Sequence, residues 1–359
     1  MVFSYYLTII PYWKTWLLLK LFRKKKQGCF YCGDLLDLEI FNPIQKYLQP
    51  LPIVAKNRKI QRQLREIGIN AKLMPVFPDF VIMTRHAAWK FPVKQIKKIG
   101  LRHGPYHFKE FTDARNYNAF NLYIMTSSED VRRGAKAGIN SAIGLGYPKL
   151  DNAFNGTYSP LFLEELKLKH SLNKTKKTIL FSATWEDSGM SAVNRWAGRL
   201  NELTEKYNVL VTLHPWTKPE TREFIRHTEG VILIDDLNLI PWIMISDVCI
   251  GDTSSVIAEF SALNKPIVTF IVETGKRLTP EIKELIRSIS LQIVDFEELK
   301  PALREITRGD RFSEARAEAN RLMFNNLDGT AGIKTASAIV KLIPELKLPG
   351  VNYVFQKLD

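Results

Sequence analysis

The chain has 359 residues, 45% of them hydrophobic, which is enough for two domains that each bury a core. Its formal net charge of +14 favours anionic partners: nucleic acid, acidic lipid, phosphate polymers or nucleotides. A single CxxC pair excludes a zinc site built from two such pairs. We therefore expect Cys29, Cys32 and Cys249 to be reduced, with a redox pair at Cys29 and Cys32 as the alternative.

Residues 1–26, MVFSYYLTIIPYWKTWLLLKLFRKKK, mix aromatic and aliphatic residues with six positive charges and no acid. The segment lacks a basic start and a cleavage site, so it is a poor signal peptide. Pro11 and Lys14 interrupt the apolar run that a spanning helix needs. Tryptophan and tyrosine followed by a basic cluster are typical of a segment in the membrane interface, drawn to anionic lipid. We predict such attachment to an anionic membrane surface; an ordinary first helix packed on the protein is the alternative.

Strands alternate with helices from residue 27 to about residue 150. An amphipathic helix is expected to end at Gly68, and a second helix, at 128–139, begins after a serine cap and stops at a glycine. This alternation predicts a parallel α/β sheet, because parallel strands are joined by helices. We assign residues 27–155 to an N-terminal Rossmann-like domain.

The alternation restarts after a linker region at 151–175, which predicts a second Rossmann-like domain over 156–332. Residues 333–359 form the closing amphipathic helix and tail. The expected fold class is α/β, with two Rossmann-like domains facing a central cleft. The strands and helices expected in the second domain lie at 177–184, 194–207 (helix), 208–215, 218–228 (helix), 230–236, 247–252 and 265–270.

The stretch GDTSSVIAEF places small and polar residues between a buried strand and an apolar helix. Ser254 and Ser255 are expected in the cap and first turn, with free backbone N–H groups that suit a phosphate. Asp252 and Thr253 precede them, and Glu259, one turn further on, is placed to reach a ribose. Two alternatives remain open: Ser254 only caps its helix, and Glu259 is an exposed helix acid.

The loop RHGPYHFK, residues 102–109, also follows a strand. It holds two histidines beside cations, and its Gly-Pro pair predicts a tight turn. A histidine here is suited to take a proton from a hydroxyl, with a structural loop histidine as the alternative. The residues concerned are Arg102, His103, Gly104, His107 and Lys109.

Two further loops follow strands of the second half. VTLHPW carries His214, whose neutral imidazole suits a phosphate or ribose hydroxyl, and FSATWEDS carries the hydroxyl of Thr184 and the indole of Trp185. Each loop alone is a weak signal. Four such loops on one side of two Rossmann-like halves predict a nucleotide-donor site.

Several activities lack their motifs. The chain contains no Walker phosphate loop, no GxGxxG after the first strand, no DxD and no HExxH. ATP hydrolysis, dinucleotide redox chemistry and zinc hydrolysis are therefore unsupported, and we expect neither a cofactor nor a metal site. Nucleic acid is not an expected partner, because the basic residues concentrate at the N-terminus and no binding module is recognisable.

The four loops RHGPYHFK, FSATWEDS, LHPW and IGDTSSVIAEFSALNKPIV stand in this chain together with GLGYPKLD (144–151) and LDGTAGIKTASAIVKLI. In this set the chain resembles the CDP-glycerol glycerophosphotransferase family, the enzymes related to teichoic acid polymerases. Taken in the order given, the six stretches are similar to that family's HGTP-type loop, PTWR-type segment, HP loop, DYSS stretch with a KP turn, GYP-x-x-D junction and NDG-x-A helix. The resemblance covers roughly residues 100–345 in the same order.

The resemblance implies a GT-B-like fold and transfer of glycerol phosphate, or a related polyol phosphate, from a CDP-activated donor, with release of CMP. The acceptor would be lipid-linked or a saccharide, in cell-surface polymer synthesis. His103 would be the general base on the acceptor hydroxyl, with the rest of its loop on the acceptor side. His214 would support the donor phosphates. The resemblance further implies a peripheral position on the cytoplasmic face of the bacterial plasma membrane.

On the donor side the same resemblance implies phosphate binding by Ser254 and Ser255, with Asp252, Thr253, Thr184 and Glu259 nearby. The chain departs from the family pattern at several positions. Pro105 follows Gly104 directly, Glu186 stands where the pattern has arginine, and Thr253 replaces tyrosine. At least one expected cation near the donor is therefore absent. Ribitol phosphate, another alditol phosphate or a nucleotide sugar remain open as the transferred group.

Two other functions stay open beside the transferase. The first is a GT-B glycosyltransferase or a nucleotide-sugar 2-epimerase that uses a UDP-sugar, because these enzymes share the two-domain cleft. The second is a binding protein that keeps the fold without turnover. A preference for UDP-sugars would single out the former, and activity in cells that survives loss of His103 would single out the latter.

Overall fold

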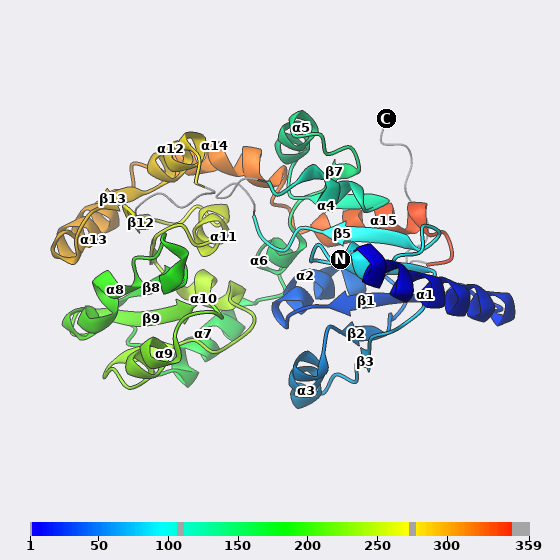
Figure 1. Cartoon of the computed structure of the whole chain (residues 1–359). Helices are drawn as coiled ribbons and strands as arrows, with labels where there is room; N and C mark the ends of the chain where they lie inside the picture. The colour runs from blue at the N-terminus through cyan, green and yellow to red at the C-terminus, as the bar shows by residue number, and fades with distance from the viewer. Residues whose placement is uncertain (1, 106–110, 273–277, 347–359) are drawn as a thin grey trace. The chain divides into compact units, whose positions relative to one another are not determined.

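The computed structural model describes residues 2–105, 111–272 and 278–346 (Figure 1). Its contacts divide the chain into two compact units. The first unit holds the described residues up to His103, from Phe111 to Asp151 and from Asp328 onward; the second holds Gly104, Pro105 and the described residues from Asn152 to Leu327. His107 and Lys109 lie outside the described residues. The limits 27–155, 156–332 and 333–359 remain predictions, while the contacts group the closing helix with the first unit.

The first unit contains a seven-stranded parallel sheet in the order β3-β2-β1-β4-β5-β6-β7. The strand order therefore reverses direction between β1 and β4. The strands are β1 (Gly28–Cys32), β2 (Ile53–Ala55), β3 (Lys72–Leu73), β4 (Phe80–Met83), β5 (Lys97–Leu101), β6 (Leu122–Met125) and β7 (Ala142–Gly144). The helices are α1 (Val2–Phe22), α2 (Leu36–Gln45), α3 (Arg58–Glu66), α4 (Ala114–Asn118), α5 (Ser128–Lys136) and α15 (Ala331–Leu342).

The second unit repeats this plan with six parallel strands in the order β10-β9-β8-β11-β12-β13. Its direction reverses between β8 and β11. The strands are β8 (Lys177–Ala183), β9 (Tyr207–Leu213), β10 (Val231–Leu233), β11 (Val248–Gly251), β12 (Ile267–Phe270) and β13 (Leu291–Ile293). The helices are α6 (Asp151–Phe154, at the boundary), α7 (Pro160–Lys169), α8 (Val193–Trp196), α9 (Pro219–Arg226), α10 (Ile240–Ile245), α11 (Val256–Ala262), α12 (Pro280–Ile289), α13 (Leu299–Arg308) and α14 (Ser313–Phe324).

Two parallel sheets with intervening helices confirm the predicted α/β class. The caps confirm local expectations as well: the Ser127 hydroxyl accepts from the Asp130 N–H ahead of α5, and Gly138 turns the chain away with a φ of +83°. One expected helix, 194–207, was wrong in its type and extent. The chain forms only α8 as an α-helix there and continues as a 3₁₀-helix over Ala197–Leu203, consistent with Gly198 being a poor helix former.

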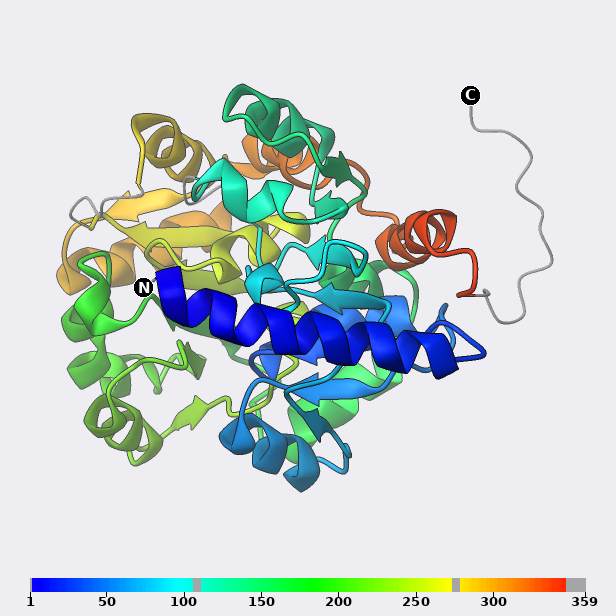
Figure 2. The same ribbon diagram turned by 45° about the vertical axis from the view of Figure 1, so that its right-hand side comes forward.

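Helix α1 is continuous and contains Pro11. One side packs on the first unit (Figure 2): the Trp16 indole is buried and its Nε1 donates to the Pro78 carbonyl at 2.8 Å, while the Tyr12 hydroxyl donates to the Val76 carbonyl at 2.6 Å. Packing on the protein, the alternative named from the sequence, is therefore present. No helix in the described part of the chain has the length and apolar character needed to cross a bilayer.

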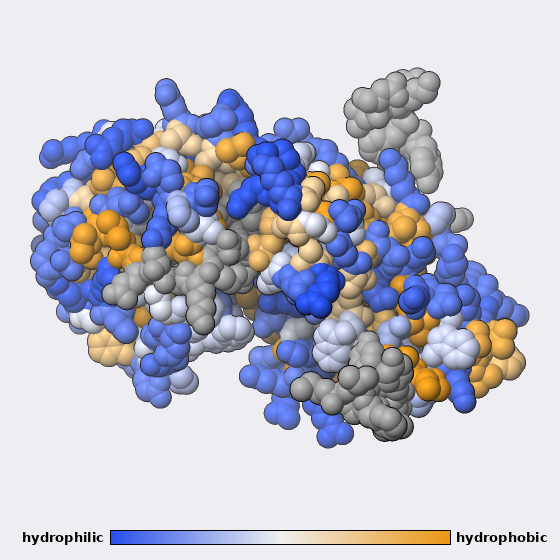
Figure 3. Space-filling view, turned by 45° about the horizontal axis from the view of Figure 1, so that its top comes forward, coloured by the Kyte–Doolittle hydropathy of each residue, from blue (hydrophilic) through white to orange (hydrophobic). Residues whose placement is uncertain are grey.

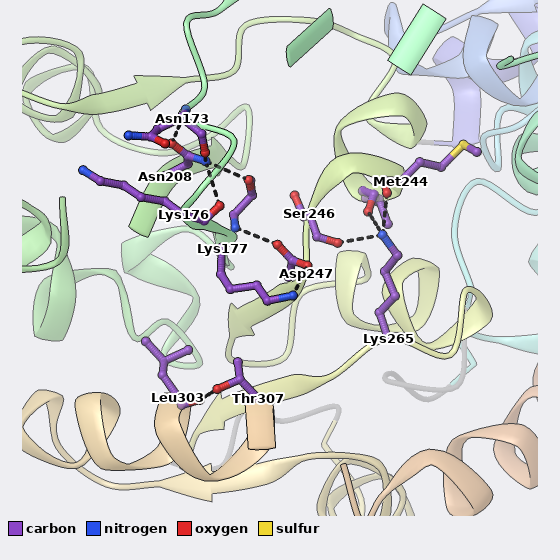
Figure 4. A network of polar contacts seen from close by, with 12 residues as sticks. Asn173, Lys176, Lys177, Asn208, Met244, Ser246, Asp247, Lys265, Leu303 and Thr307 are labelled. Carbon is purple, nitrogen blue, oxygen red and sulfur yellow. Dashed lines mark hydrogen bonds and ion pairs between the residues drawn. The ribbon is translucent and has the colours of Figure 1, made fainter. Parts of the chain in front are cut away.

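A polar network joins the amino ends of the strands in the second unit (Figure 4). The Lys265 ammonium donates to the carbonyls of Ile243, Met244 and Ser246 at 3.1, 2.5 and 2.6 Å, and so caps the end of α10. The Asp247 carboxylate accepts from the Thr178 N–H at 2.8 Å. The lysine of the family-like KP turn is therefore a helix cap, at the strand end opposite the donor loops.

Candidate functional site

The donor loops lie where the fold predicts a ligand. In open parallel sheets, ligands bind outside the carboxyl ends of the strands where the strand order reverses. The segment after β8 begins at Thr184 and the segment after β11 begins at Asp252, and these two strands flank the reversal. His214 follows β9, the next strand along. The sequence therefore placed three of its loops correctly at one edge of one sheet.

Asp252 organises this edge. Its carboxylate is 1% exposed and accepts hydrogen bonds from five donors. These are the Thr184 N–H and hydroxyl at 3.0 Å, the Ala192 N–H at 2.9 Å, the Ser254 N–H at 3.0 Å and the Thr253 N–H. Burial raises the pKa of Asp252, and the N–H donors oppose this rise. The carboxylate therefore fixes the loops and has no face left for a ligand.

One expectation about the helix start was wrong. The Ser254 N–H was predicted to be free for a phosphate, but it donates to Asp252. The Ser254 hydroxyl lies 3.0 Å from that of Ser182 and accepts from the Val256 N–H at 3.4 Å, but the N-cap position of α11 is Ser255, so Ser254 is not the helix cap. Ser255 is exposed and Ser254 is half-buried. These two hydroxyls are what the loop presents to solvent.

The other predicted donor-side residues lie below the surface. Thr184, Thr253 and Glu259 are all buried. The Thr184 and Thr253 hydroxyls lie 3.1 Å apart, within the cluster around Asp252. The alternative interpretation of Glu259 as an exposed helix acid is wrong. In this unit taken by itself, these side chains support the loop from behind.

His214 sits in an aromatic cluster. The Trp216 N–H donates to its Nδ1 at 3.1 Å, so in the neutral ring the proton is on Nε2 and that nitrogen is a donor. Its ring lies 4.6 Å from the Trp185 ring and 5.4 Å from the Trp216 ring, centroid to centroid. Trp216 is 68% exposed and was not singled out in the sequence. Its position beside the HP pair was the available signal.

The segment with Glu186 contacts Lys218 in two ways. One Glu186 carboxylate oxygen accepts from the Lys218 N–H at 3.2 Å, next to the start of α9. The Lys218 ammonium pairs with the Asp187 carboxylate at 3.2 Å. The Lys218 side chain is thus paired with the residue after Glu186, and only its backbone N–H contacts Glu186 itself.

The acceptor-side loop is held mainly through its backbone. His103 is exposed, and its carbonyl accepts from the Tyr147 hydroxyl at 3.4 Å. The Arg102 guanidinium donates to the Tyr117 hydroxyl at 3.1 Å and interacts electrostatically with Asp130, so it is part of the support of the loop. Burial raises the pKa of Asp130 to about 7, against the opposing effect of Arg102. Gly104 is half-buried.

Two motifs far apart in the sequence meet in the first unit. The Asp151 carboxylate of GLGYPKLD accepts from the N–H groups of Ala331 and Gly332 at 3.1 and 2.6 Å, at the start of α15. A Cβ on Gly332 would lie 2.4 Å from the Pro43 carbonyl oxygen, so glycine is required by this close approach. Both motifs are therefore structural: they dock the closing helix on α2.

A further polar cluster, not predicted from the sequence, lies at the strand reversal of the first unit. Asp37 is fully buried; it accepts from the Gly33 and Asp34 N–H groups at 2.8 and 3.0 Å and pairs with the Arg85 Nε at 2.7 Å. The Gly-Asp loop after the first strand was its only signal. The three cysteines are buried and free, and burial raises the pKa of Cys29 and of Cys32 to about 12.

Comparison with known proteins decides the family. The model of the family described as CDP-Glycerol:Poly(glycerophosphate) glycerophosphotransferase matches residues 81–340. The chain belongs to this glycerophosphotransferase family. The resemblance seen in the sequence is thereby confirmed, and the match begins in β4, upstream of the first family-like loop.

Curated glycerophosphotransferase relatives are longer than this chain. The teichoic acid ribitol-phosphate polymerase TarL of Staphylococcus aureus (strain NCTC 8325 / PS 47) is 27% identical over 210 residues, covering 55% of this chain and 36% of the relative. A teichoic acid glycerol-phosphate primase of Bacillus subtilis (strain 168) is 28% identical over 193 residues, covering 49% and 47%. The chain thus spans between a third and a half of the length of these relatives.

Among solved structures, the wall teichoic acid polymerase TagF shares the fold. It aligns with a TM-score of 0.65 at 15% identity, covering 89% of this chain and 90% of that chain. At this identity the likeness concerns the fold alone. It agrees with the two parallel sheets described above and with the fold that the sequence resemblance implies.

Proposed function

We propose that this chain transfers glycerol phosphate, or a related polyol phosphate, from a CDP-activated donor to an acceptor hydroxyl and releases CMP. The observation that carries the proposal is the loop built around Asp252. Because five donors are committed to that carboxylate, the loop is preformed and presents Ser254 and Ser255 at the reversal of the sheet. Preformed hydroxyl and N–H donors stabilise charge without reorganising during the reaction.

In the proposed reaction, His103 removes the proton from the acceptor hydroxyl. The acceptor oxygen forms a bond to the phosphorus that carries the polyol, and the bond from that phosphorus to the bridging oxygen breaks. CMP leaves with the bridging oxygen. The Nε2–H of His214 donates to the donor phosphates, an assignment supported by the hydrogen bond that its Nδ1 accepts.

The proposed residues divide between two sides. Residues 27–155 act on the acceptor, through His103 with Arg102, Gly104, His107 and Lys109. Residues 156–332 hold the donor, with Ser254 and Ser255 contacting phosphate. Asp252, Thr253, Thr184 and Glu259 support that contact from behind, which their burial favours over direct binding.

The proposed acceptor is lipid-linked or a saccharide in a cell-surface polymer, and the proposed location is the cytoplasmic face of the bacterial plasma membrane. Helix α1 supports the attachment, because its outer face carries exposed apolar and basic residues. Hydrophobic side chains also reach the surface between hydrophilic ones on the face drawn in Figure 3. The exposed apolar residues of α1 are Ile10, Trp13, Leu17, Leu18, Leu19, Leu21 and Phe22.

CMP release by the purified chain tests the reaction. CDP-glycerol, CDP-ribitol and UDP-sugars are supplied in parallel with a membrane-lipid extract as acceptor. We expect CMP from a CDP-polyol, with kcat reduced by about 10²–10⁴-fold in His103→Ala, because general base catalysis contributes that much. His227→Ala is the matched control, since His227 is an exposed histidine of the second unit. Release of UDP from a sugar nucleotide, with no CMP from any CDP-polyol, would instead favour the glycosyltransferase alternative.

A further inference from the structure

A cavity opens at the amino edge of the sheet in the first unit, at the strand ends opposite the His103 loop. Its volume is about 560 Å³, which is in the range of small-ligand sites. Gly28 and Phe80, the first residues of β1 and β4, form its floor together with Lys72 of β3. The chain leaving α1 and the chain leaving α15 both contribute lining residues, and the ion pair between Lys26 and Glu345 joins these two segments.

Three cations from two segments line this cavity: Arg23 and Lys26 between α1 and β1, and Lys72 of β3. Arg23 is structural, because it is mostly buried and pairs with the Asp79 carboxylate at 3.4 Å, which also accepts the Gln27 N–H at 2.8 Å. Arg23 and Asp79 therefore fix the turn that follows α1. Lys26 and Lys72 remain as the cations available to a ligand.

Lys26 is held only weakly by its partner. Its ammonium lies 2.7 Å from the Glu345 carboxylate, but both side chains are about half exposed, and such pairs contribute little. Lys72 is exposed and has no acidic partner within ion-pair distance among the residues that the structure describes. Burial keeps the Cys29 thiol in the wall neutral by raising its pKa to about 12, so the thiol adds no negative charge.

Much of the remainder of the wall is apolar, and Gln27, Gln49 and Glu345 are its other polar residues. The apolar part comes from prolines and aliphatic or aromatic residues on two loops that connect strands. At the mouth, Arg23 directly follows Leu21 and Phe22, which are 74% and 80% exposed and are the last residues of α1. Consecutive Cα atoms are about 3.8 Å apart, so the backbone of this apolar pair lies next to the lining residue Arg23, and we call the pair the rim. The apolar wall residues are Pro50, Leu51, Pro52, Pro75, Val76, Phe77 and Pro78.

We propose that this cavity binds the phosphate of an anionic membrane lipid, with Lys26 and Lys72 contacting the phosphate and Leu21 and Phe22 meeting the acyl chains. A free phosphate would use the cations alone and gain nothing from the apolar wall and rim. A lipid uses both, because its headgroup is anionic and its chains are apolar. The proposal rests on the attachment of α1 to the membrane and concerns a site separate from the transfer chemistry.

The test measures binding of the full chain to soluble dihexanoyl phosphatidylglycerol below its micelle concentration, with inorganic phosphate in parallel. We expect one saturable lipid site in the unchanged chain. Lys72→Gln and Lys26→Gln should each weaken it about tenfold. Lys59→Gln should change it less than twofold, because Lys59 is an exposed lysine on α3 of the same unit, outside the cavity. All three substitutions remove one exposed charge, so the melting temperature should stay constant.

Three outcomes overturn the proposal: no saturable lipid binding, equal effects of Lys72→Gln and Lys59→Gln, or inorganic phosphate binding as tightly as the lipid. The last outcome identifies a free-phosphate site. Binding to vesicles of phosphatidylcholine, with and without phosphatidylglycerol, then distinguishes attachment of α1 to the membrane from lipid binding in the cavity. If vesicles bind but Lys72→Gln has no specific effect, α1 attaches and the cavity takes no lipid.

The transferase reaction is followed independently, as CMP release with a water-soluble acceptor. Lys72→Gln should leave that rate unchanged, because the cavity lies at the strand ends away from His103. A chain that binds the lipid but releases no CMP from any CDP-polyol would refute the proposed reaction and leave the lipid site standing.

Discussion

The loops at the carboxyl edges of the two sheets are held in different ways. In the second unit one buried carboxylate, Asp252, collects donors from three segments and ties them together. In the first unit the His103 loop is held by its backbone, since the Arg102 N–H donates to the Ile124 carbonyl at 3.1 Å and the His103 carbonyl accepts from Tyr147. The donor side therefore depends strongly on one side chain, whereas contacts of the acceptor side are divided among Ile124 of β6, Tyr147 and the Arg102 side chain.

Removing the Asp252 carboxylate should strongly destabilise the donor-side loops. Asp252→Ala leaves the buried N–H groups of Thr184, Ala192 and Ser254 without their acceptor, and we expect a loss of at least about 4 kcal/mol in the free energy of unfolding. Urea denaturation followed by circular dichroism measures it. Asp187→Ala is the control, because Asp187 is an exposed acid on a neighbouring segment, and it should cost less than about 0.5 kcal/mol. A small loss in Asp252→Ala would show that the loop is held by other contacts.

The pH dependence of stability tests the acceptor side of the same comparison, through Asp130, which interacts with Arg102 of the His103 loop. The pKa of Asp130 is about 7 in the folded chain and about 3.9 in the unfolded chain, so between these values the folded state binds more protons and stability falls as pH rises. Asp130→Asn removes this loss. We expect the variant to gain on the order of 2–4 kcal/mol over the unchanged chain at pH 8 and little at pH 4.

Thermal or urea unfolding of the unchanged chain and of the Asp130→Asn variant at pH 4, 6 and 8 measures this gain. Asp295→Asn serves as the control, since Asp295 is exposed, and it should differ by less than about 0.5 kcal/mol at each pH. A gain that is the same at all three pH values would contradict the assignment to the protonation of Asp130.

The smallest expected effect concerns Asp151. Asp151→Ala removes the acceptor for the Ala331 and Gly332 N–H groups, and loss of such a cap costs about 1–2 kcal/mol. Hydrogen exchange should become faster in α15, with the strands of the second unit unchanged. Faster exchange in both units alike would mean that Asp151 has a wider role than docking one helix.

Local patterns in the sequence were sufficient for much of the fold. The alternation of strands and helices, the caps at Ser127 and Gly138 and the positions of three donor loops all follow from short-range rules. The stretch around Gly198 shows where such rules fail, because an α-helix was expected there and much of it is a 3₁₀-helix. The order of the strands is a long-range property, and residue spacing alone does not predict it.

The long-range contacts of the candidate-site residues were not predicted from the sequence. Asp252 was expected beside the donor, and it turned out to be the acceptor for Ala192, 60 residues away in the chain. Asp151 and Gly332 stood in two family-like motifs, yet their contact spans 181 residues. Such contacts form only once the sheets have brought the segments together, so no short stretch of sequence reveals them.

The docking of α15 on α2 has a consequence for the order in which the chain matures on the ribosome. Most of the second unit lies within one stretch, from Asn152 to Leu327, and is synthesised before α15 emerges. The first unit begins earlier but lacks its closing helix until Asp328 and the residues after it have been made. The unit whose synthesis begins first is therefore completed last. Until α15 has been made, the face of α2 around Pro43 lacks the helix that packs on it.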